Sequence, residues 1–215
     1  MPSQPPSREP LVLLTITGLA LAWSAVNPYD YLTWILETAP VFIGVAIIIP
    51  TRKSFPLSPL LFRLLVLHAI ILIVGAHYTY AKVPLGLWFQ DLFDLSRNHY
   101  DRLGHIAQGF VPAILVRELL IRRSPLPRGK WMAFLTVSVC LAFSAFYEMI
   151  EWWAAVVNEQ AAESFLGTQG DHWDTQWDMF LALLGASAAL FLLSKTHDRS
   201  LLKISERAGI APTAG

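Results

Sequence analysis

The chain has 215 residues, of which 54% are hydrophobic and 15% are charged, with a formal net charge of zero and a mean hydropathy of +0.47. Average soluble domains carry about 25% charged residues, so this composition indicates a membrane protein with several spans. The neutral net charge argues against nucleic acid as a partner. The single cysteine, Cys140, lies in an apolar run and excludes an internal disulfide.

Six apolar runs approach or reach the length of about 17–25 residues that a membrane-spanning helix needs. The predicted spans cover residues 11–26, 31–50, 60–80, 101–121, 131–157 and 171–194. The first run also fits a cleaved signal peptide, because Ala20-Leu21-Ala22 has the form of a cleavage site. Residues 81–100 are too mixed to span, but their run with Trp88 beside Asp91 suits a short helix lying at the interface.

The sequence therefore predicts an all-α fold, a polytopic membrane helical bundle of about six transmembrane helices plus a short interfacial helix. We expect residues 1–10 to form a disordered N-tail, 11–195 the six-helix membrane domain and 196–215 a cytoplasmic C-tail. Twelve of the sixteen Lys and Arg residues lie in the termini or in and beside the second and fourth loops. By the positive-inside rule these segments, and hence both termini, are cytoplasmic.

Polar residues of this topology gather in one layer near the outer surface. Asp101, His105 and Gln108 are spaced four and three residues apart, so they share one helix face. The last outer turns of the fifth span and the first turns of the sixth add further acids at the same depth: Glu148, Glu151, Asp174 and Asp178. Weaker candidates for the same polar layer are Asp171, Glu37 and His77.

An ionisable group at membrane depth costs about 2.5–3.5 kcal/mol on insertion scales, so these groups must face one another, water or a cation. Protonation, a metal ion, or the nearby Arg97 and Arg102 could offset the acidic charge. The candidate metal ligands are Asp101, His105, Glu148, Asp174 and Asp178. With oxygen ligands in the majority, the cation would be Mg²⁺, Mn²⁺, Ca²⁺ or Zn²⁺. Glu151 and His105 are the candidate catalytic residues, with Glu151 as general base toward a metal-activated water.

Several of these residues also have structural interpretations. Asp171 and Asp174 fit a helix cap and a first-turn acid, whereas Asp178 lies too deep to benefit from the helix dipole. Asp101 could cap its own helix, and a lone His105 could be a hydrogen-bonded structural residue. At the inner side, Arg117 and Glu118 are expected to pair with each other. Three histidines are expected at the surface: His99, His172 and His197.

Three sequence blocks, residues 100–113, 142–155 and 165–179, closely resemble the YjdF-like family of bacterial inner-membrane proteins, whose function is unknown. The resemblance implies a compact, multi-pass helical domain in the bacterial inner membrane. More remotely, Asp101-x3-His105 and Asp174-x3-Asp178 followed by Gly185 resemble VanZ-like proteins, a group linked to teicoplanin tolerance. That match departs at the helix starts, so the phenotype is not transferred.

Three functions fit these features. The leading hypothesis is a metal-dependent membrane protein that acts on a lipid or lipid-linked substrate at the outer face of the bilayer. The first alternative is a proton- or ion-coupled transporter in which the carboxylates form a relay. The second is a non-catalytic binding or assembly module, in which the polar cluster fixes helix packing. The sequence gives no indication of the oligomeric state.

Overall fold

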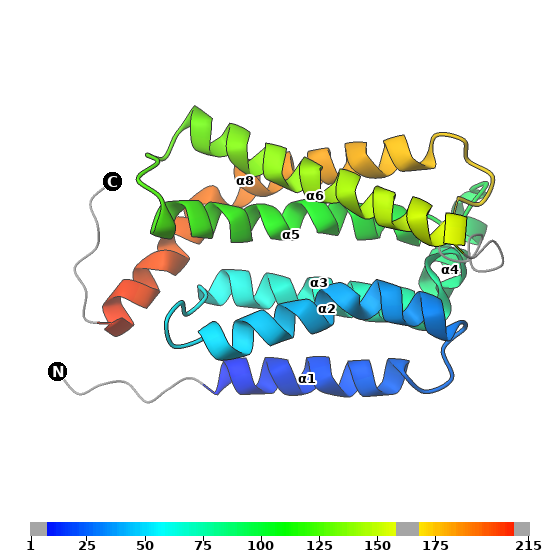
Figure 1. Cartoon of the computed structure of the whole chain (residues 1–215), viewed down its shortest axis with the longest axis horizontal. Helices are drawn as coiled ribbons and strands as arrows, with labels where there is room; N and C mark the ends of the chain where they lie inside the picture. Colours follow the sequence, from blue (N-terminus) through cyan, green and yellow to red (C-terminus); the bar gives the residue numbers. More distant parts are fainter. Residues whose placement is uncertain (1–7, 158–167, 209–215) are drawn as a thin grey trace.

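The computed structural model describes residues 8–157 and 168–208, and every regular element within these ranges is a helix (Figure 1). The helices are α1 (Glu9–Ser24), α2 (Tyr31–Thr51), α3 (Pro59–Tyr78), the 3₁₀ helix η1 (Tyr80–Lys82), α4 (Pro84–Phe93), α5 (Tyr100–Arg123), α6 (Lys130–Val157) and α8 (Asp174–Ala208). The predicted all-α membrane bundle is confirmed.

Five of these helices are long and apolar enough to cross a membrane: α2, α3, α5, α6 and α8. Helix α1 is also apolar but has only 16 residues. The short helix expected within residues 81–100 is α4, which exposes Trp88 and Phe89. Helix α1 begins at Glu9, so the last two residues of the expected N-tail are helical, and residues 1–7 lie outside the described part of the chain.

Helix α8 differs from the predicted span, because it continues past residue 194 to Ala208. The polar residues after position 194 suggested a tail in water. In the structure, His197 and Ser200 are instead buried against the rest of the bundle, so the helix extends through them.

Side-chain caps and prolines set several helix starts. The Asp30 carboxylate accepts a hydrogen bond from the Thr33 amide at 2.7 Å, which caps α2. The Ser58 hydroxyl accepts from the Leu61 amide at 3.3 Å, and Pro59 follows as the first residue of α3. These local signals place the helix starts next to the loops identified from the sequence.

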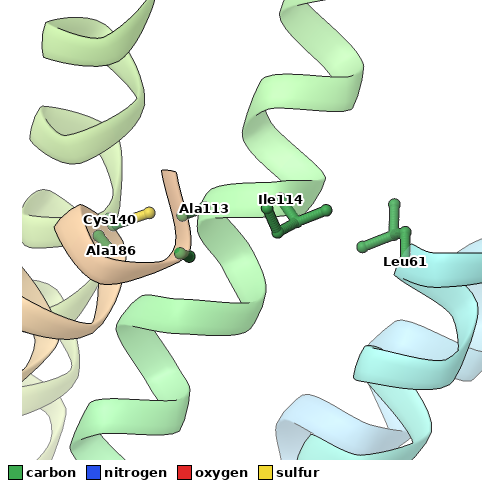
Figure 2. Packing of buried hydrophobic residues seen from close by; sticks show 6 residues of the cluster. Leu61, Ala113, Ile114, Cys140 and Ala186 are labelled. Carbon is green, nitrogen blue, oxygen red and sulfur yellow. The ribbon is translucent and has the colours of Figure 1, made fainter. Parts of the chain in front are cut away.

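The bundle consists of two groups of helices that meet at α5 (Figure 1). Helices α5, α6 and α8 contact one another, and α3 contacts α5 while also packing against α1 and α2. Figure 2 shows the apolar cluster at this junction, where Ile114 of α5 points toward Leu61 of α3. Cys140 is buried in the same cluster, as expected for a packing residue.

Helices α5 and α8 approach each other backbone to backbone. A Cβ atom at Gly109 would collide with the backbone of Ala182, and one at Gly185 would collide with the carbonyl oxygen of Ile106. Only glycine permits this spacing. Because Gly109 lies one turn after His105 on α5, the close approach also brings the polar face of α5 against α8.

The start of α1 and the end of α8 lie at the same end of the bundle, and α4 lies at the opposite end (Figure 1). We call these the terminal end and the α4 end. The start of α5, the last turns of α6 and the start of α8 all lie at the α4 end (Figure 1), so the polar residues predicted on these three helices lie at this end.

Candidate functional site

Helices α5, α6 and α8 together carry the acidic and imidazole groups of the α4 end. The α5 residues are Asp101, His105 and Gln108; those of α6 are Glu148 and Glu151; those of α8 are Asp174 and Asp178. All three helices contact one another. A carboxylate–imidazole cluster from three separate helices therefore exists inside the bundle.

His105 is the centre of this cluster. Its Nδ1 lies 2.8 Å from Oε1 of Gln108, and its Nε2 lies 3.4 Å from Oδ1 of Asp101 and 3.8 Å from Oδ1 of Asp178. When Nδ1–H donates to Gln108, the Nε2 lone pair of a neutral imidazole faces two carboxylate oxygens. This contact is repulsive unless a proton or a metal cation lies between the atoms. In this tautomer a proton or a metal cation is therefore needed between Nε2 and these oxygens.

Two overlapping sets of side chains could hold such a cation. Asp101, His105 and Asp178 form the first set, and His105, Glu148 and Glu151 form the second, with the ligand atoms of each set within 4.8 Å of one another. Oδ1 of Asp178 and Oε1 of Glu148 are buried and have no hydrogen-bond partner among the described residues. Because a buried carboxylate oxygen without a donor is costly, both atoms favour a proton or a cation beside them.

Asp174 belongs to neither set, although the sequence suggested it as a metal ligand. Its carboxylate forms a salt bridge with Nη1 of Arg97. Nη2 of the same arginine lies 3.8 Å from Oδ2 of Asp101. Arg97 is 5% exposed and borders the cluster, so it offsets the charge of Asp174 from within the protein.

Asp171 lies just before α8 and does not reach the cluster. Its Oδ1 accepts a hydrogen bond from the Trp173 amide at 2.9 Å, and its Oδ2 lies 3.0 Å from Nη2 of Arg102. The Trp173 amide, with the charges of Arg97 and Arg102, holds the pKa of Asp171 below its ordinary value. The structural interpretation of Asp171 as a helix-start residue therefore fits its contacts.

Of the weaker candidates, His77 lies apart from the cluster. Its Nδ1 lies 3.1 Å from the carbonyl oxygen of Ser24, and the centroid of its ring lies 4.4 Å from the ring centroid of Trp23. Glu37 is buried on α2, and its Oε2 has no hydrogen-bond partner among the described residues. The predicted depth of both residues could not show which way each side chain points.

Sequence reasoning missed Tyr80, which lies near both Glu37 and Asp101. Burial raises the pKa of Tyr80 well above its ordinary value, and the nearby Glu37, Tyr147 and Asp101 raise it further. Its ring lies where a Cβ atom at Gly75 or Gly104 would be. The two glycines, one on α3 and one on α5, are a signal in the sequence that a large ring fits between these helices.

A second polar network lies at the terminal end. Nε2 of His197 lies 3.0 Å from Oε2 of Glu118, and Nδ1 of His197 lies 2.8 Å from Nη1 of Arg117. Glu118 Oε1 also accepts from the Ser58 amide at 3.0 Å and from Arg122 Nη1 at 2.8 Å. The expectation that His197 lies at the surface is wrong, because it is completely buried. Glu118 and Arg117 do not pair with each other in these contacts but share His197.

Apolar helices of membrane-spanning length around buried polar clusters define a polytopic integral membrane protein. The chain matches the family described as "Predicted membrane protein (DUF2238)" over residues 9–199, and it belongs to that family. It is 51% identical over 197 residues to "Inner membrane protein YjdF" of Escherichia coli (strain K12), which covers 90% of this chain and 94% of that protein. The resemblance seen in the three sequence blocks is confirmed. No solved structure matches the chain significantly.

Proposed function

We propose that this protein binds a divalent cation in the carboxylate–imidazole cluster and uses it to act on a lipid or lipid-linked substrate. The observation that carries the proposal is the position of His105, whose Nε2 faces carboxylate oxygens from α5 and α8 at 3.4 and 3.8 Å. A cation between these atoms turns the repulsive contact into coordination. Oδ1 of Asp178 supports the same assignment, because it is buried and has no hydrogen-bond partner in the part of the chain that the structure describes.

In this proposal Asp101, His105 and Asp178 hold the cation, and Glu148 lies beside them. Gln108 fixes the imidazole through Nδ1, which leaves Nε2 as the ligand atom. The ligand set of one imidazole and several carboxylates suits Mg²⁺, Mn²⁺, Ca²⁺ or Zn²⁺. A cation of this kind lowers the pKa of bound water. Glu151 is the general base of the proposal, because it lies in the second set with His105 and Glu148.

The site would face the extracytoplasmic side of the inner membrane. The terminal end of the bundle carries most of the basic loop residues, among them Arg52, Lys53, Arg122 and Arg123, and the positive-inside rule assigns that end to the cytoplasm. The α4 end then lies near the outer leaflet. Exposed tryptophans on α6, just before α8 and in its first turn fit that interface: Trp152, Trp153, Trp173 and Trp177.

The direct test is metal analysis of the purified full chain after incubation with Mn²⁺ or Zn²⁺ and removal of excess ion. We expect about one tightly held ion per chain in the wild type and its loss in Asp178→Asn. Asp91→Asn is the matched control, because Asp91 is exposed on α4. If the wild type retains no stoichiometric metal, the cation site does not exist.

A proton- or ion-coupled transporter is the second candidate. It is favoured by the presence of a carboxylate–imidazole group at each end of the α5–α8 pair, His105 with Asp178 and His197 with Glu118. The apolar cluster of Figure 2 separates the two groups, which favours the cation site over a relay. Proton flux into proteoliposomes that is lost in Glu148→Gln would support transport instead.

The third candidate, a binding or assembly module, predicts that the cluster only fixes the packing of α5, α6 and α8. In that case Glu151→Gln and Asp178→Asn would both unfold more easily and neither would alter metal content. Normal stability with altered metal content would reject it.

A further inference from the structure

A cavity of about 440 Å³ opens at the α4 end, between the segment before α5 and the segment before α8. Its lining includes Arg97, His99, Arg102, Gln169 and Asp171. The volume falls within the range of about 300–1,000 Å³ that ligand pockets occupy. The cavity does not include the ligand atoms of the candidate cation site.

Hydrogen bonds fix the walls of this cavity. Oε1 of Gln169 accepts from the Asn98 amide at 3.0 Å, and Nε2 of Gln169 donates to the Asn98 carbonyl oxygen at 3.0 Å. The Asn98 side chain in turn donates to the carbonyl oxygen of Val83 at 3.1 Å and accepts from the Tyr100 amide at 2.9 Å. The two segments are therefore held together before any ligand arrives, which reduces the entropy cost of binding.

The lining carries more positive than negative charge. Two guanidinium groups, of Arg97 and Arg102, face one carboxylate, that of Asp171. The imidazole of His99 lies in the same lining. Arg97 is already paired with Asp174, so an anion entering the cavity would chiefly give Arg102 a second partner beside Asp171.

Two nitrogen atoms in the lining are also available to a ligand, and the one on His99 is a donor in the Nδ1–H tautomer. Nε of Arg102 and Nδ1 of His99 are buried, and neither has a hydrogen-bond partner among the described residues. Arg102 uses Nη2 to contact Asp171 at 3.0 Å, so its Nε–H remains for a second acceptor. Unpaired buried donors of this kind favour an acceptor with several oxygens.

We propose that this cavity binds a phosphate group, with Arg102 and His99 as the donors and Arg97 as the charge behind it. Guanidinium groups suit phosphate because their N–H donors match its oxygens in geometry and charge. Asp171 occupies part of the same guanidinium surface and competes with the phosphate.

A lipid headgroup is the source that the surroundings favour. Trp177 lies beside Arg102, 5.4 Å from the guanidinium carbon to the ring centroid, and Trp88 and Phe89 of α4 are exposed. Aromatic side chains of this kind gather at the depth of the lipid headgroups. The inference that the bound phosphate is part of the substrate rests on the proposed function. Phosphate binding itself does not require the cation.

Arg97 connects the two sites. It borders the cavity, forms a salt bridge with Asp174, and lies 3.8 Å from Asp101, a proposed cation ligand. A phosphate-bearing lipid held in the cavity would therefore have its headgroup next to the cation site.

The test measures binding to the purified full chain in neutral detergent with a chelator present, so that no divalent cation contributes. The probes are short-chain phosphatidic acid, the matching diacylglycerol without phosphate, and inorganic phosphate. We expect phosphatidic acid to bind and the diacylglycerol to bind at least about tenfold more weakly. Weaker binding of inorganic phosphate supports a lipid source, and equal binding supports a soluble phosphate instead.

Variants then assign the binding to the cavity. Arg102→Gln and His99→Gln should each weaken phosphatidic acid binding by about tenfold, and Asp171→Asn should strengthen it because the competing carboxylate is gone. His99→Gln removes no salt bridge, so it separates lost binding from lost folding. Arg52→Gln, at an exposed position of the other end, is the control and should change nothing.

Binding that is absent in the wild type, or unchanged in both Arg102→Gln and His99→Gln, would overturn the phosphate site. Asp178→Asn distinguishes this outcome from failure of the proposed function. Under our proposal that variant loses metal but keeps phosphatidic acid binding, so either site can fail while the other stands.

Discussion

Glu118 of α5 and His197 of α8 lie 79 positions apart in the sequence, and their side chains meet at 3.0 Å with both completely buried. The pair also holds the first turn of α3, since Glu118 accepts from the Ser58 amide. Three helices are therefore joined through one carboxylate at the terminal end.

Removing this carboxylate should destabilise the bundle strongly. We expect Glu118→Ala to lower the free energy of unfolding by about 3–5 kcal/mol, because it leaves His197 and the Ser58 amide buried without their acceptor. Thermal or denaturant unfolding in detergent measures the change. The control Asp91→Ala, at an exposed carboxylate, should change stability little. Equal stability of the two variants would show that the network contributes nothing.

A glycine-to-alanine substitution should have opposite effects on stability at Gly109, where α5 approaches α8 closely, and at Gly44 of α2. Gly109→Ala forces the helices apart and should cost about 1–3 kcal/mol, because the new methyl group meets the backbone of Ala182. Gly44→Ala is the matched control, since a Cβ atom there meets nothing within 4 Å, and alanine favours the helix by about 1 kcal/mol. If both variants have the same melting temperature, the helices do not pack as described.

The stability of the folded protein should depend on pH in the acid range through Asp171. Its pKa in the folded chain is lowered by the Trp173 amide and by Arg97 and Arg102, so the ionised form is the one that stabilises the fold. The stabilisation is complete above the unfolded pKa of 3.8 and is lost as the pH falls through the lower, folded pKa. We expect the stability difference between the wild type and Asp171→Asn to be constant from pH 7 to about 5 and to shrink below pH 4. A difference that stays the same at pH 3 would contradict the assigned contacts.

The orientation of the bundle can be tested by labelling single cysteines in intact cells. Cys140 is 2% exposed and should not react with a maleimide until the protein unfolds. In the wild-type background, Asp91→Cys on α4 should react with a membrane-impermeant maleimide from outside. Ser54→Cys, in the exposed loop at the other end, should react only after the inner membrane is opened. The reverse pattern would place the cation site on the cytoplasmic side.

The sequence was informative wherever one helix determined the outcome. Apolar runs located the spans, and the spacing of Asp101, His105 and Gln108 put them on one face of α5. The depth argument also brought the acids of α6 and α8 to the same end. Each of these predictions needs only the helical repeat and the thickness of the bilayer.

The sequence was less informative where a side chain has more than one possible partner. Asp174 and Asp178 are one turn apart, yet the first pairs with Arg97 and the second faces His105. His197 was placed at the surface because polar residues surround it in the sequence, and only the packing of α8 on α5 shows that it is buried. The phosphate cavity is formed by two loops distant in sequence, so no local pattern reports it.

The apolar cluster between the two ends of α5 has an electrical consequence. A transmembrane potential falls mainly across the part of a protein that excludes water and charge, and here that part is the layer around Leu61, Ile114 and Cys140. An ion reaching His105 from the α4 end would cross little of this potential drop. Its affinity should therefore change little when the cell is depolarised, and the layer itself should keep the bilayer sealed to protons.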